Sequence, residues 1–392
     1  MELYLIDGAR TPFGTYMGEL RHLSAPALAI TAGREAISRS GAKPEDFDSV
    51  VLGNVMQGER ESFYLSKYVG LQLGMRDEIT GLVVNRLCGS GMQAVVSTGQ
   101  AMLCGDAGLA LVGGTENMSR APHILRGARE GFKGDQTLED PLLGPHNVFV
   151  DPAAGMIMGE TAEELSDAYG VTRAQMDEFS LRSQQAAAAA IASGRMAKEI
   201  VAVEIPSRGG PKLVDKDEHP REVSLEKLAT LKAAFRKGGN VTPGNASGIN
   251  DGACALVMAT GERVEQLGLK PCARIVSWGV SGVPGKHMGI GPAPAIRTAL
   301  AKAGLTLEQM DLIEINEAFA GQYLACEAEL KLDRAKVNVN GGAIALGHPI
   351  GASGARILLT LAYELAERNL KYGVASACIG GGQGIAVVLE RV

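Results

Sequence analysis

The feature that most constrains this 392-residue chain is an internal repeat. When the sequence is shifted along itself by 263 residues, segment 36–41 aligns with 299–304 and 48–50 with 311–313, without a gap. Each copy has the pattern of an amphipathic helix, a glycine that ends it, a short acidic turn and an apolar strand. At the same offset Ser90-Gly91 aligns with Ser353-Gly354, and glycine-ended apolar strands follow at 109–114 and 374–380. A generic α/β composition could produce one such match, but several at nearly one offset predict two duplicated α/β halves.

Residues 119–249 have no partner in the repeat, so the halves are unequally spaced. We therefore predict an N-terminal half at 1–118 plus 250–270, an inserted loop domain at 119–249, and a C-terminal half at 271–392. A long insertion in one copy is usually where that copy was adapted to a ligand. Segment 195–237 carries ten Lys/Arg and seven Asp/Glu, which suits an anionic ligand and equally a solvated surface.

Composition excludes several classes of protein. The net charge of −6 argues against a nucleic-acid partner, and no apolar stretch reaches the roughly 20 residues of a membrane span. The six cysteines form no CxxC pair, and no histidine is spaced to complete a zinc site with them. Segment 1–7 is typical of a strand rather than a signal peptide, and the chain does not end in a peroxisomal signal. We expect a cytoplasmic protein without a membrane or metal partner.

Cys88 occupies a glycine turn between an apolar strand at 81–84 and an apolar helix. A thiol at a helix N-terminus gains from the unpaired N–H groups, which favour the thiolate and lower its pKa. The same N–H groups can form an oxyanion hole for a thioester or carbonyl substrate. The alternative is a small buried cysteine that fills a gap between helix and sheet.

Two further turns carry reactive side chains. His348 lies between a glycine and a proline in the bent segment 338–351, and a histidine is a natural base for a thiol near neutral pH. It could equally be a loop histidine bonded to backbone. Cys378 ends an apolar strand before three glycines, and this turn lacks the GxGxxG spacing of a dinucleotide site. By the repeat, the Cys88 and Cys378 turns lie at the same edge of their halves, so two thiols and an imidazole could face one another.

Five motifs occur in order: NRLCGSGMQA at 85–94, NASGINDGA at 245–253, NEAFA at 316–320, GHP at 347–349 and CIGGGQG at 378–384. Together they resemble the thiolase family, from DGARTP at 7–12 to the last strand, with MGIGP at 288–292 as a further match. The resemblance implies an α/β fold of two βαβαβαββ halves in a five-layer αβαβα core, with a loop domain inserted in the first half. It implies reversible cleavage of 3-ketoacyl-CoA by CoA, or the Claisen condensation of acetyl-CoA.

The resemblance also implies the roles of five residues. Cys88 would carry the acyl group as a thioester, and His348 would activate it. His348, with a water held by Asn316, would stabilise the enolate oxygen, and Cys378 would move the proton of the α-carbon. The N–H groups of Cys88 and Gly380 would form a second oxyanion hole. This chemistry uses CoA and acyl-CoA as substrates and implies no metal or redox cofactor.

For CoA, the resemblance places Arg221 near the adenine or its phosphate and Ser247 near the pantetheine. The tunnel would be lined by Phe235, Ala246, Ile249, Met288, Ala318 and Phe319, with Met158 at its acyl end. Ile157 stands where many biosynthetic acetoacetyl-CoA thiolases have a histidine, which favours the broader, degradative 3-ketoacyl group of fatty-acid β-oxidation. The loop between His123 and His146 occupies the region that thiolases use to pair dimers, so we expect a homotetramer.

Three other classes of protein fit part of this pattern. A decarboxylating ketosynthase-like enzyme has a Cys-His-His constellation, against which Asn316 and Cys378 argue. A non-catalytic acyl-CoA-binding protein of this ancestry should have lost a cysteine or the histidine, and all are present. A redox protein would instead pair Cys88 with Cys378 as a disulfide.

Overall fold

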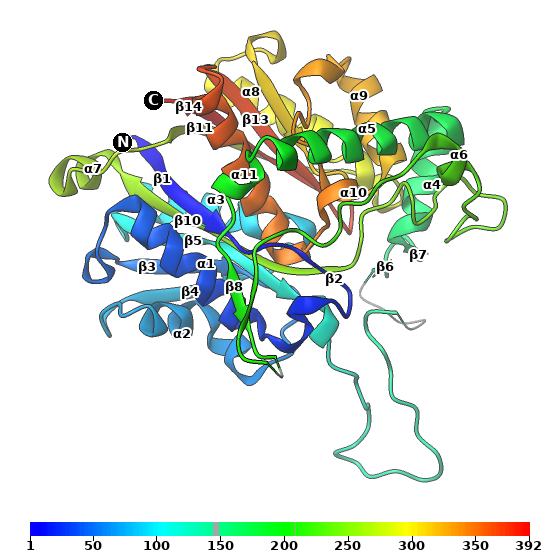
Figure 1. Cartoon of the computed structure of the whole chain (residues 1–392), viewed down its shortest axis with the longest axis horizontal. Coiled ribbons are helices and arrows are strands. Elements are labelled where there is room, and N and C mark those ends of the chain that lie inside the picture. The colour runs from blue at the N-terminus through cyan, green and yellow to red at the C-terminus, as the bar shows by residue number, and fades with distance from the viewer. Residues whose placement is uncertain (144–148, 208) are drawn as a thin grey trace.

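The computed structural model describes residues 1–143, 149–207 and 209–392. Its main sheet joins two sets of strands (Figure 1). The first set has the order β4-β3-β5-β10-β1 and the second the order β12-β13-β14-β11, and β1 pairs antiparallel with β11. The first set comprises β1 (Leu3–Arg10), β3 (Ser49–Gly53), β4 (Thr80–Val84), β5 (Leu109–Asn117) and β10 (Asn250–Thr260). The second comprises β11 (Ala273–Gly282), β12 (Leu312–Ile315), β13 (Tyr372–Ile379) and β14 (Gln383–Arg391).

The pairing pattern is the same in both sets. In the first, β3 runs parallel to β5, and β5, β10 and β1 follow in antiparallel order. In the second, β12 runs parallel to β13, and β13, β14 and β11 follow in antiparallel order. The duplication predicted from the sequence is therefore present in the fold.

One strand differs between the halves. The first half has β4 paired along the full length of β3, whereas its counterpart in the second half is a single parallel bridge between Ile313 and Val337. Asn338 follows at once with φ 47°, in the left-handed region, so the extended chain ends there. The second half thus keeps this position of the expected βαβαβαββ order as a bridge rather than as a full strand.

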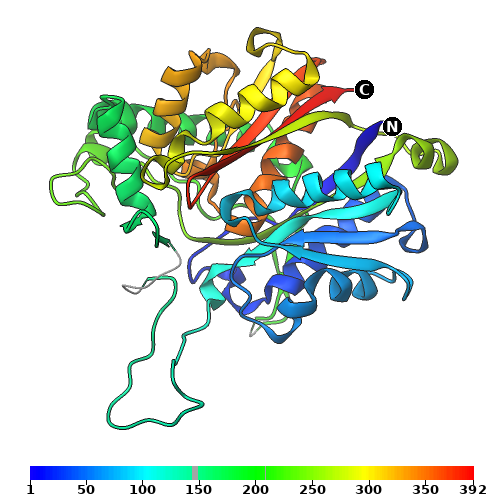
Figure 2. The ribbon, with the colours of Figure 1, turned by 180° about the vertical axis from the view of Figure 1, so that it is seen from behind.

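Helices cover both halves and fill the space between them (Figure 2). α1 (Ala25–Ser40) and α2 (Leu65–Gln72) pack outside the first half, and α8 (Pro292–Ala303) and α9 (Ala320–Leu330) outside the second. α3 (Ser90–Cys104) and α11 (Ile350–Glu367) pack against each other in the middle. Three buried apolar clusters lie between these layers, which gives the expected αβαβα arrangement.

The repeated helices end as the sequence predicts. α1 begins at Ser24, whose side chain accepts a hydrogen bond from Ala27 N, and it ends at Gly41 with φ 74°. Its counterpart α8 has Pro292 in its first turn and ends at Gly304 with φ 66°. Glycine adopts this left-handed conformation without the steric cost that other residues meet.

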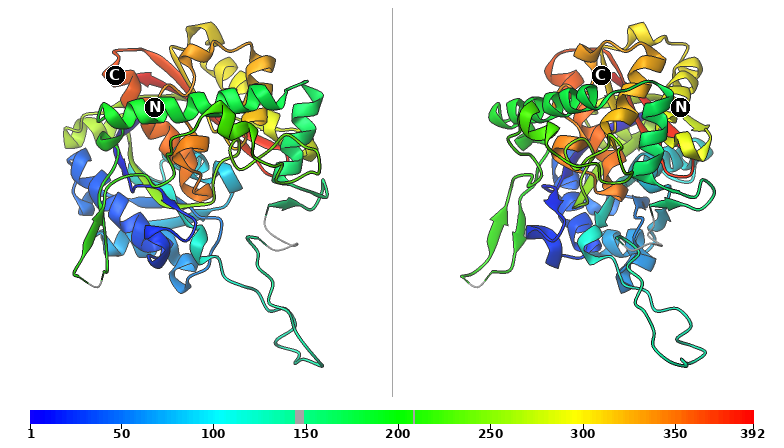
Figure 3. Two further views of the ribbon diagram at one scale, coloured as in Figure 1. Left: turned by 45° about the vertical axis from the view of Figure 1, so that its right-hand side comes forward. Right: turned by 90° about the vertical axis from the view of Figure 1, so that its right-hand side faces the viewer.

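The chain between β5 and β10 passes over the second half and then, through β8 and β9, along the first half (Figures 1 and 3). It contains α4 (Met158–Ala168), the long α5 (Arg173–Ala192), α6 (Leu225–Ala229) and the short strand pairs β6 (Val150–Asp151)/β7 (Met156–Ile157) and β8 (Val203–Ile205)/β9 (Lys212–Val214). A loop through 121–143 extends away from the body, with one bridge between Ile124 and Glu139. His146 and the rest of 144–148 lie outside the described residues.

The remaining elements are short: β2 (Gly14–Thr15), α7 (Gly261–Leu267) and α10 (Ala343–Leu346). No helix of the described chain is long and apolar enough to cross a membrane.

Candidate active site

Cys88 lies in the turn between β4 and α3, within a 3-10 turn at Leu87–Gly89. Ser90 fixes this turn, because its Oγ accepts from Arg86 N at 2.9 Å and donates to Leu87 O at 2.7 Å. Gly89 packs closely against Ile379, since a Cβ there would lie 2.5 Å from Ile379 Cδ1 and the isoleucine would have to shift. The turn therefore leaves Cys88 partly exposed at the start of a buried helix.

His348 lies between α10 and α11, after Gly347 with φ 99°. Its backbone N donates to Asn250 Oδ1 at 2.9 Å, and its Nδ1 lies 2.6 Å from Ser353 Oγ. Ser353 Oγ donates its own hydrogen to Pro349 O at 2.9 Å, so it accepts from Nδ1–H. This tautomer leaves Nε2 as an acceptor, 3.4 Å from Asn316 Nδ2.

One cavity of about 230 Å³ opens onto both Cys88 and His348. Most of its wall is apolar, as in sites that bury an organic ligand. The residues that we predicted for CoA and that line it are Met158, Phe235, Ala246, Ser247, Ile249, Met288, Ala318 and Phe319. Ile157 also lines it.

A second cavity of about 120 Å³ adjoins the first. The two share Cys88, Phe149, Met158 and Ile350, so they meet at the thiol. Gly380 lines this second cavity, and its backbone N–H lowers the pKa of the Cys88 thiol slightly against the effect of burial. Cys88 is therefore accessible from two sides.

Three predicted residues lie outside both cavity walls. Cys378 is fully buried directly behind the wall, in a cluster with Ala246 and Met288. Asn316 is buried beside His348, and its Oδ1 has no hydrogen-bond partner within the described structure. Arg221 is exposed, and its Nη2 donates to Pro243 O at 3.0 Å, three residues before Ala246.

Burial determines the protonation states of the site. It raises the pKa of Cys88 to about 11, against the smaller effect of the Gly380 and Cys88 N–H groups, and it raises the pKa of Cys378 well above its usual value. Burial, followed by the nearby Arg356 charge, lowers the pKa of His348 to about 4. The lowered thiol pKa that we predicted from the helix N-terminus is therefore wrong, because loss of solvation outweighs the N–H groups. Near neutral pH both thiols are protonated and the imidazole is neutral.

Several residues around the site were not predicted from the sequence. Asn250 and Ser353 hold His348, and both lie in or beside motifs that were noted for other residues. Met118, Leu142, Leu143, Phe149 and Ile350 line the first cavity. Leu142, Leu143 and Phe149 belong to a segment without periodicity, which gives no signal for a wall residue.

Comparison with known families gives matches to both parts of the chain. The thiolase N-terminal domain model matches residues 3–262, and the thiolase C-terminal domain model matches residues 269–391. The chain belongs to the thiolase family.

Individual thiolases match over their full length. An acetyl-CoA acetyltransferase of Syntrophomonas wolfei is 46% identical, covering 100% of this chain and 99% of the relative. The mitochondrial 3-ketoacyl-CoA thiolase of Mus musculus is 46% identical, covering 99% and 98%. The crystal structure of human mitochondrial 3-ketoacyl-CoA thiolase in complex with CoA has a TM-score of 0.96 at 45% identity, covering 100% and 98%. As a thiolase, this chain is an acyltransferase that acts with CoA, and neither the ketosynthase-like nor the non-catalytic alternative is favoured.

Proposed function

We propose that this thiolase cleaves 3-ketoacyl-CoA with CoA, and runs the reverse condensation, through an acyl group carried on Cys88. The observation that carries the proposal is that Cys88 and His348 open onto one apolar cavity, while Cys88 and Gly380 line a second cavity that adjoins it. A thiol nucleophile, a base and an N–H donor are the parts that acyl transfer between thioesters needs.

In the first half-reaction, His348 Nε2 takes the proton of Cys88, and the thiolate attacks the 3-keto carbon. The N–H groups of Cys88 and Gly380 hold the oxygen of the tetrahedral intermediate. The bond between C2 and C3 then breaks, and the electron pair forms the enolate of acetyl-CoA. His348, with a water on the unpartnered Asn316 Oδ1, stabilises the enolate oxygen, and Cys378 protonates C2.

In the second half-reaction, the Cys378 thiolate takes the thiol proton of CoA, and the CoA sulfur attacks the acyl-Cys88 thioester. The new acyl-CoA leaves, and the Cys88 thiolate regains its proton from His348. Thiolate nucleophile and thiolate leaving group have similar basicity, so this step is nearly reversible. Thiols, imidazole and amides suffice for every step, and we propose that no metal or redox cofactor takes part. Activity that survives chelation and dialysis supports this, and activity restored only by an added metal contradicts it.

For the acyl group, we propose a 3-ketoacyl chain longer than acetoacetyl. The second cavity continues beyond Cys88 between Met158 and Ile350, and its other walls include Leu87, Phe149 and Val150. Its volume of about 120 Å³ is close to the roughly 150 Å³ of an engineered cavity that binds benzene. That space fits a tail of several carbons and favours a degradative 3-ketoacyl-CoA thiolase.

The test is steady-state thiolysis with CoA and a series of 3-ketoacyl-CoAs that starts at acetoacetyl-CoA. We expect acetyl-CoA release that holds or rises with longer tails, and loss of activity in Cys88→Ala. Activity confined to acetoacetyl-CoA would contradict the acyl-length proposal and indicate an acetyl-CoA acetyltransferase. No release from any substrate would contradict the whole function.

We also propose a cytoplasmic homotetramer. Two exposed apolar features support the assembly: the extended loop, where Leu138 is 61% exposed, and the edge strand β4, where Leu82 is 49% exposed. A sheet edge and a protruding loop supply two separate contact surfaces, as a dimer of dimers needs. Light scattering of the eluting protein would give the mass, with a tetramer expected and a monomer contradicting the proposal; cell fractionation would test the compartment.

A further inference from the structure

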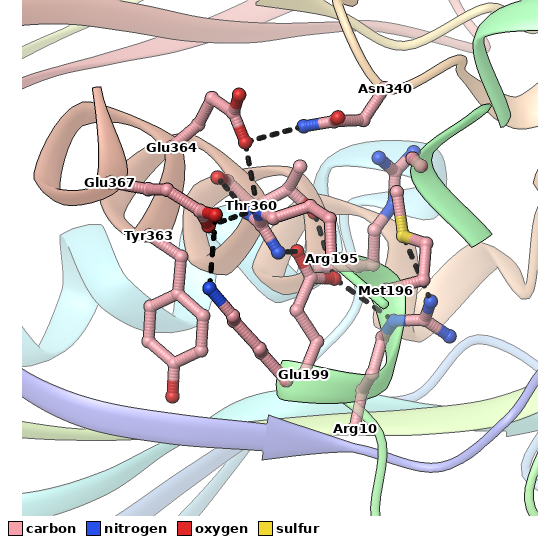
Figure 4. A network of polar contacts seen from close by, with 12 residues as sticks. Arg10, Arg195, Met196, Glu199, Asn340, Thr360, Tyr363, Glu364 and Glu367 are labelled. Atoms are coloured by element: carbon pink, nitrogen blue, oxygen red, sulfur yellow. Dashed lines mark hydrogen bonds and ion pairs between the residues drawn. The ribbon is translucent and has the colours of Figure 1, made fainter. Parts of the chain in front are cut away.

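Buried charged side chains form a connected series of ion pairs, here called the ion-pair chain (Figure 4). Arg10 Nε on β1 contacts Glu199 Oε2 at 3.1 Å, and Glu199 Oε1 contacts Arg195 Nη1 at 2.8 Å. Arg195 Nε then contacts Glu364 Oε2 on α11 at 2.7 Å. All four side chains are buried, and the contacts join the first half, the segment after α5 and the second half. Removal of one partner from such a chain leaves an uncompensated buried charge.

At one end the ion-pair chain reaches the segment that carries His348. Asn340 Nδ2 donates to Glu364 Oε2 at 2.7 Å, on the same oxygen that Arg195 contacts (Figure 4). Between Asn340 and His348 the backbone turns through Gly341, with φ 78°, and Gly347, with φ 99°. Glycine restricts the backbone angles at these two positions very little. The conformation of the segment therefore depends on its contacts with other parts of the protein. Glu317 holds this segment at Asn338 and Ile344, and Glu364 holds it at Asn340.

At the other end the ion-pair chain reaches the segment before Arg221. The Arg10 guanidinium donates to both carboxylate oxygens of Asp217, at 2.7 and 2.9 Å. Two residues later His219 packs behind Gly248 of the cavity wall, where a Cβ would lie 2.3 Å from the ring carbon Cε1. The same ion pairs therefore hold both Asp217 and Asn340.

We propose that Glu364 is a positioning residue for His348, which it places through Asn340, with Arg195 holding Glu364 in turn. Glu364 does not touch the substrate. The inference rests on the proposed function, in which His348 is the base for Cys88. Arg195, in the segment after α5, would then support catalysis although it does not line either cavity.

The first test is Glu364→Gln, which keeps the shape of the side chain. Both carboxylate oxygens of Glu364 accept hydrogen bonds, from Arg195, Asn340 and Arg368. Whichever oxygen the amide nitrogen of the variant replaces, that nitrogen faces another donor and a hydrogen bond is lost. We expect kcat for thiolysis, and the rate of Cys88 alkylation by iodoacetamide, to fall at least tenfold. The acid limb of the alkylation profile should move to higher pH, because a displaced loop admits water and the pKa of His348 rises toward its ordinary value. KM for CoA should change less than kcat.

A second variant, at Asn340, tests whether Glu364 acts through this residue. Asn340→Asp alone places two carboxylates together and should lose as much activity as Glu364→Gln. The double variant keeps a single carboxylate in the cluster, now on the loop, but one atom at position 364 still faces both Arg195 and position 340, so kcat should recover part of the loss and exceed that of either single variant. The matched control is Glu367→Gln, on the same helix and 3.5 Å from Arg195 but without a contact to Asn340. It should keep kcat within about twofold.

Two results would overturn the proposal. One is a Glu364→Gln protein that melts at lower temperature but keeps the wild-type kcat and alkylation profile, which would mean a purely structural role. The other is a double variant whose losses multiply. If the wild type releases no acetyl-CoA, the proposed function fails, but the alkylation comparison needs no acyl-CoA and still decides the role of Glu364.

Discussion

The two halves share a strand order but use equivalent positions differently, as two aligned serines show. Ser90 in the first half bonds Arg86 N and Leu87 O, and so holds the turn that carries Cys88. Its counterpart Ser353 in the second half bonds the ring of His348. Duplication thus supplied two glycine turns at the start of central helices, and each half has adapted its turn to one partner of a thiol–imidazole pair.

The edge strands teach the same lesson. β4 pairs with β3 over five residues and leads directly into the Cys88 turn, whereas the second half has only the Ile313–Val337 bridge. After Val337 the chain leaves the sheet and forms the glycine-rich segment that carries His348. The regular half therefore carries the proposed nucleophile, and the irregular half carries the proposed base.

The largest difference between the two halves should follow from removing the thiol of Cys88. Cys88→Ala should lower kcat at least about 10⁴-fold, in line with the loss of other covalent nucleophiles. The matched control is Cys104→Ala, at the far end of the same helix and exposed, which should keep wild-type activity. Steady-state thiolysis measures both, and similar losses in the two variants would contradict the role of Cys88.

A second prediction concerns a buried carboxyl in each half. Glu116 accepts three backbone N–H groups and the Asn54 amide, whereas Glu314 has only Arg356 at 3.8 Å. Burial raises the pKa of Glu314 to about 8. A carboxyl with a raised pKa contributes stability below its unfolded pKa and loses it as pH rises through the folded value.

The wild type should therefore lose on the order of 4 kcal/mol of unfolding free energy from this group between about pH 4.5 and 8. Glu314→Gln should remove that part of the pH dependence. Urea unfolding at several pH values measures it, and an unchanged slope in the variant would contradict the assignment.

The aligned serines give the sharpest matched pair. Ser353→Ala removes the partner of His348 Nδ1, so we expect kcat to fall about 10–100-fold, worth about 1.4–2.7 kcal/mol, with little change in melting. Ser90→Ala should lower the unfolding free energy by about 1–3 kcal/mol because two buried backbone groups lose a partner, with a smaller loss of kcat. Equal kcat losses in both variants would remove the distinction between the turns.

The smallest effects should come from the edge strands. Val337→Ala removes a fully buried side chain and should cost about 2 kcal/mol of stability. Leu82→Lys, on the exposed edge of β4, should change stability by less than about 0.5 kcal/mol but reduce the assembled mass in light scattering. A tetramer that survives Leu82→Lys would place the subunit contact elsewhere.

Local patterns in the sequence were sufficient for much of the fold. The helix ends at Gly41 and Gly304 and the strand–turn–helix around Cys88 follow from residue type and spacing. The loss of the second edge strand depends on a left-handed Asn338, and the raised pKa of Cys88 depends on burial by distant segments. Neither is visible in a local pattern. Leu142 and Leu143 reach the cavity from a loop whose path no periodicity encodes.

The central claim is the acyl group on Cys88, and mass spectrometry of the intact and digested protein tests it most directly. After incubation with acetyl-CoA and rapid acid quench, we predict one acetyl group on the peptide that contains Cys88, lost again on addition of CoA. An unmodified Cys88 peptide, or an acetyl group on Cys378 instead, would contradict the account.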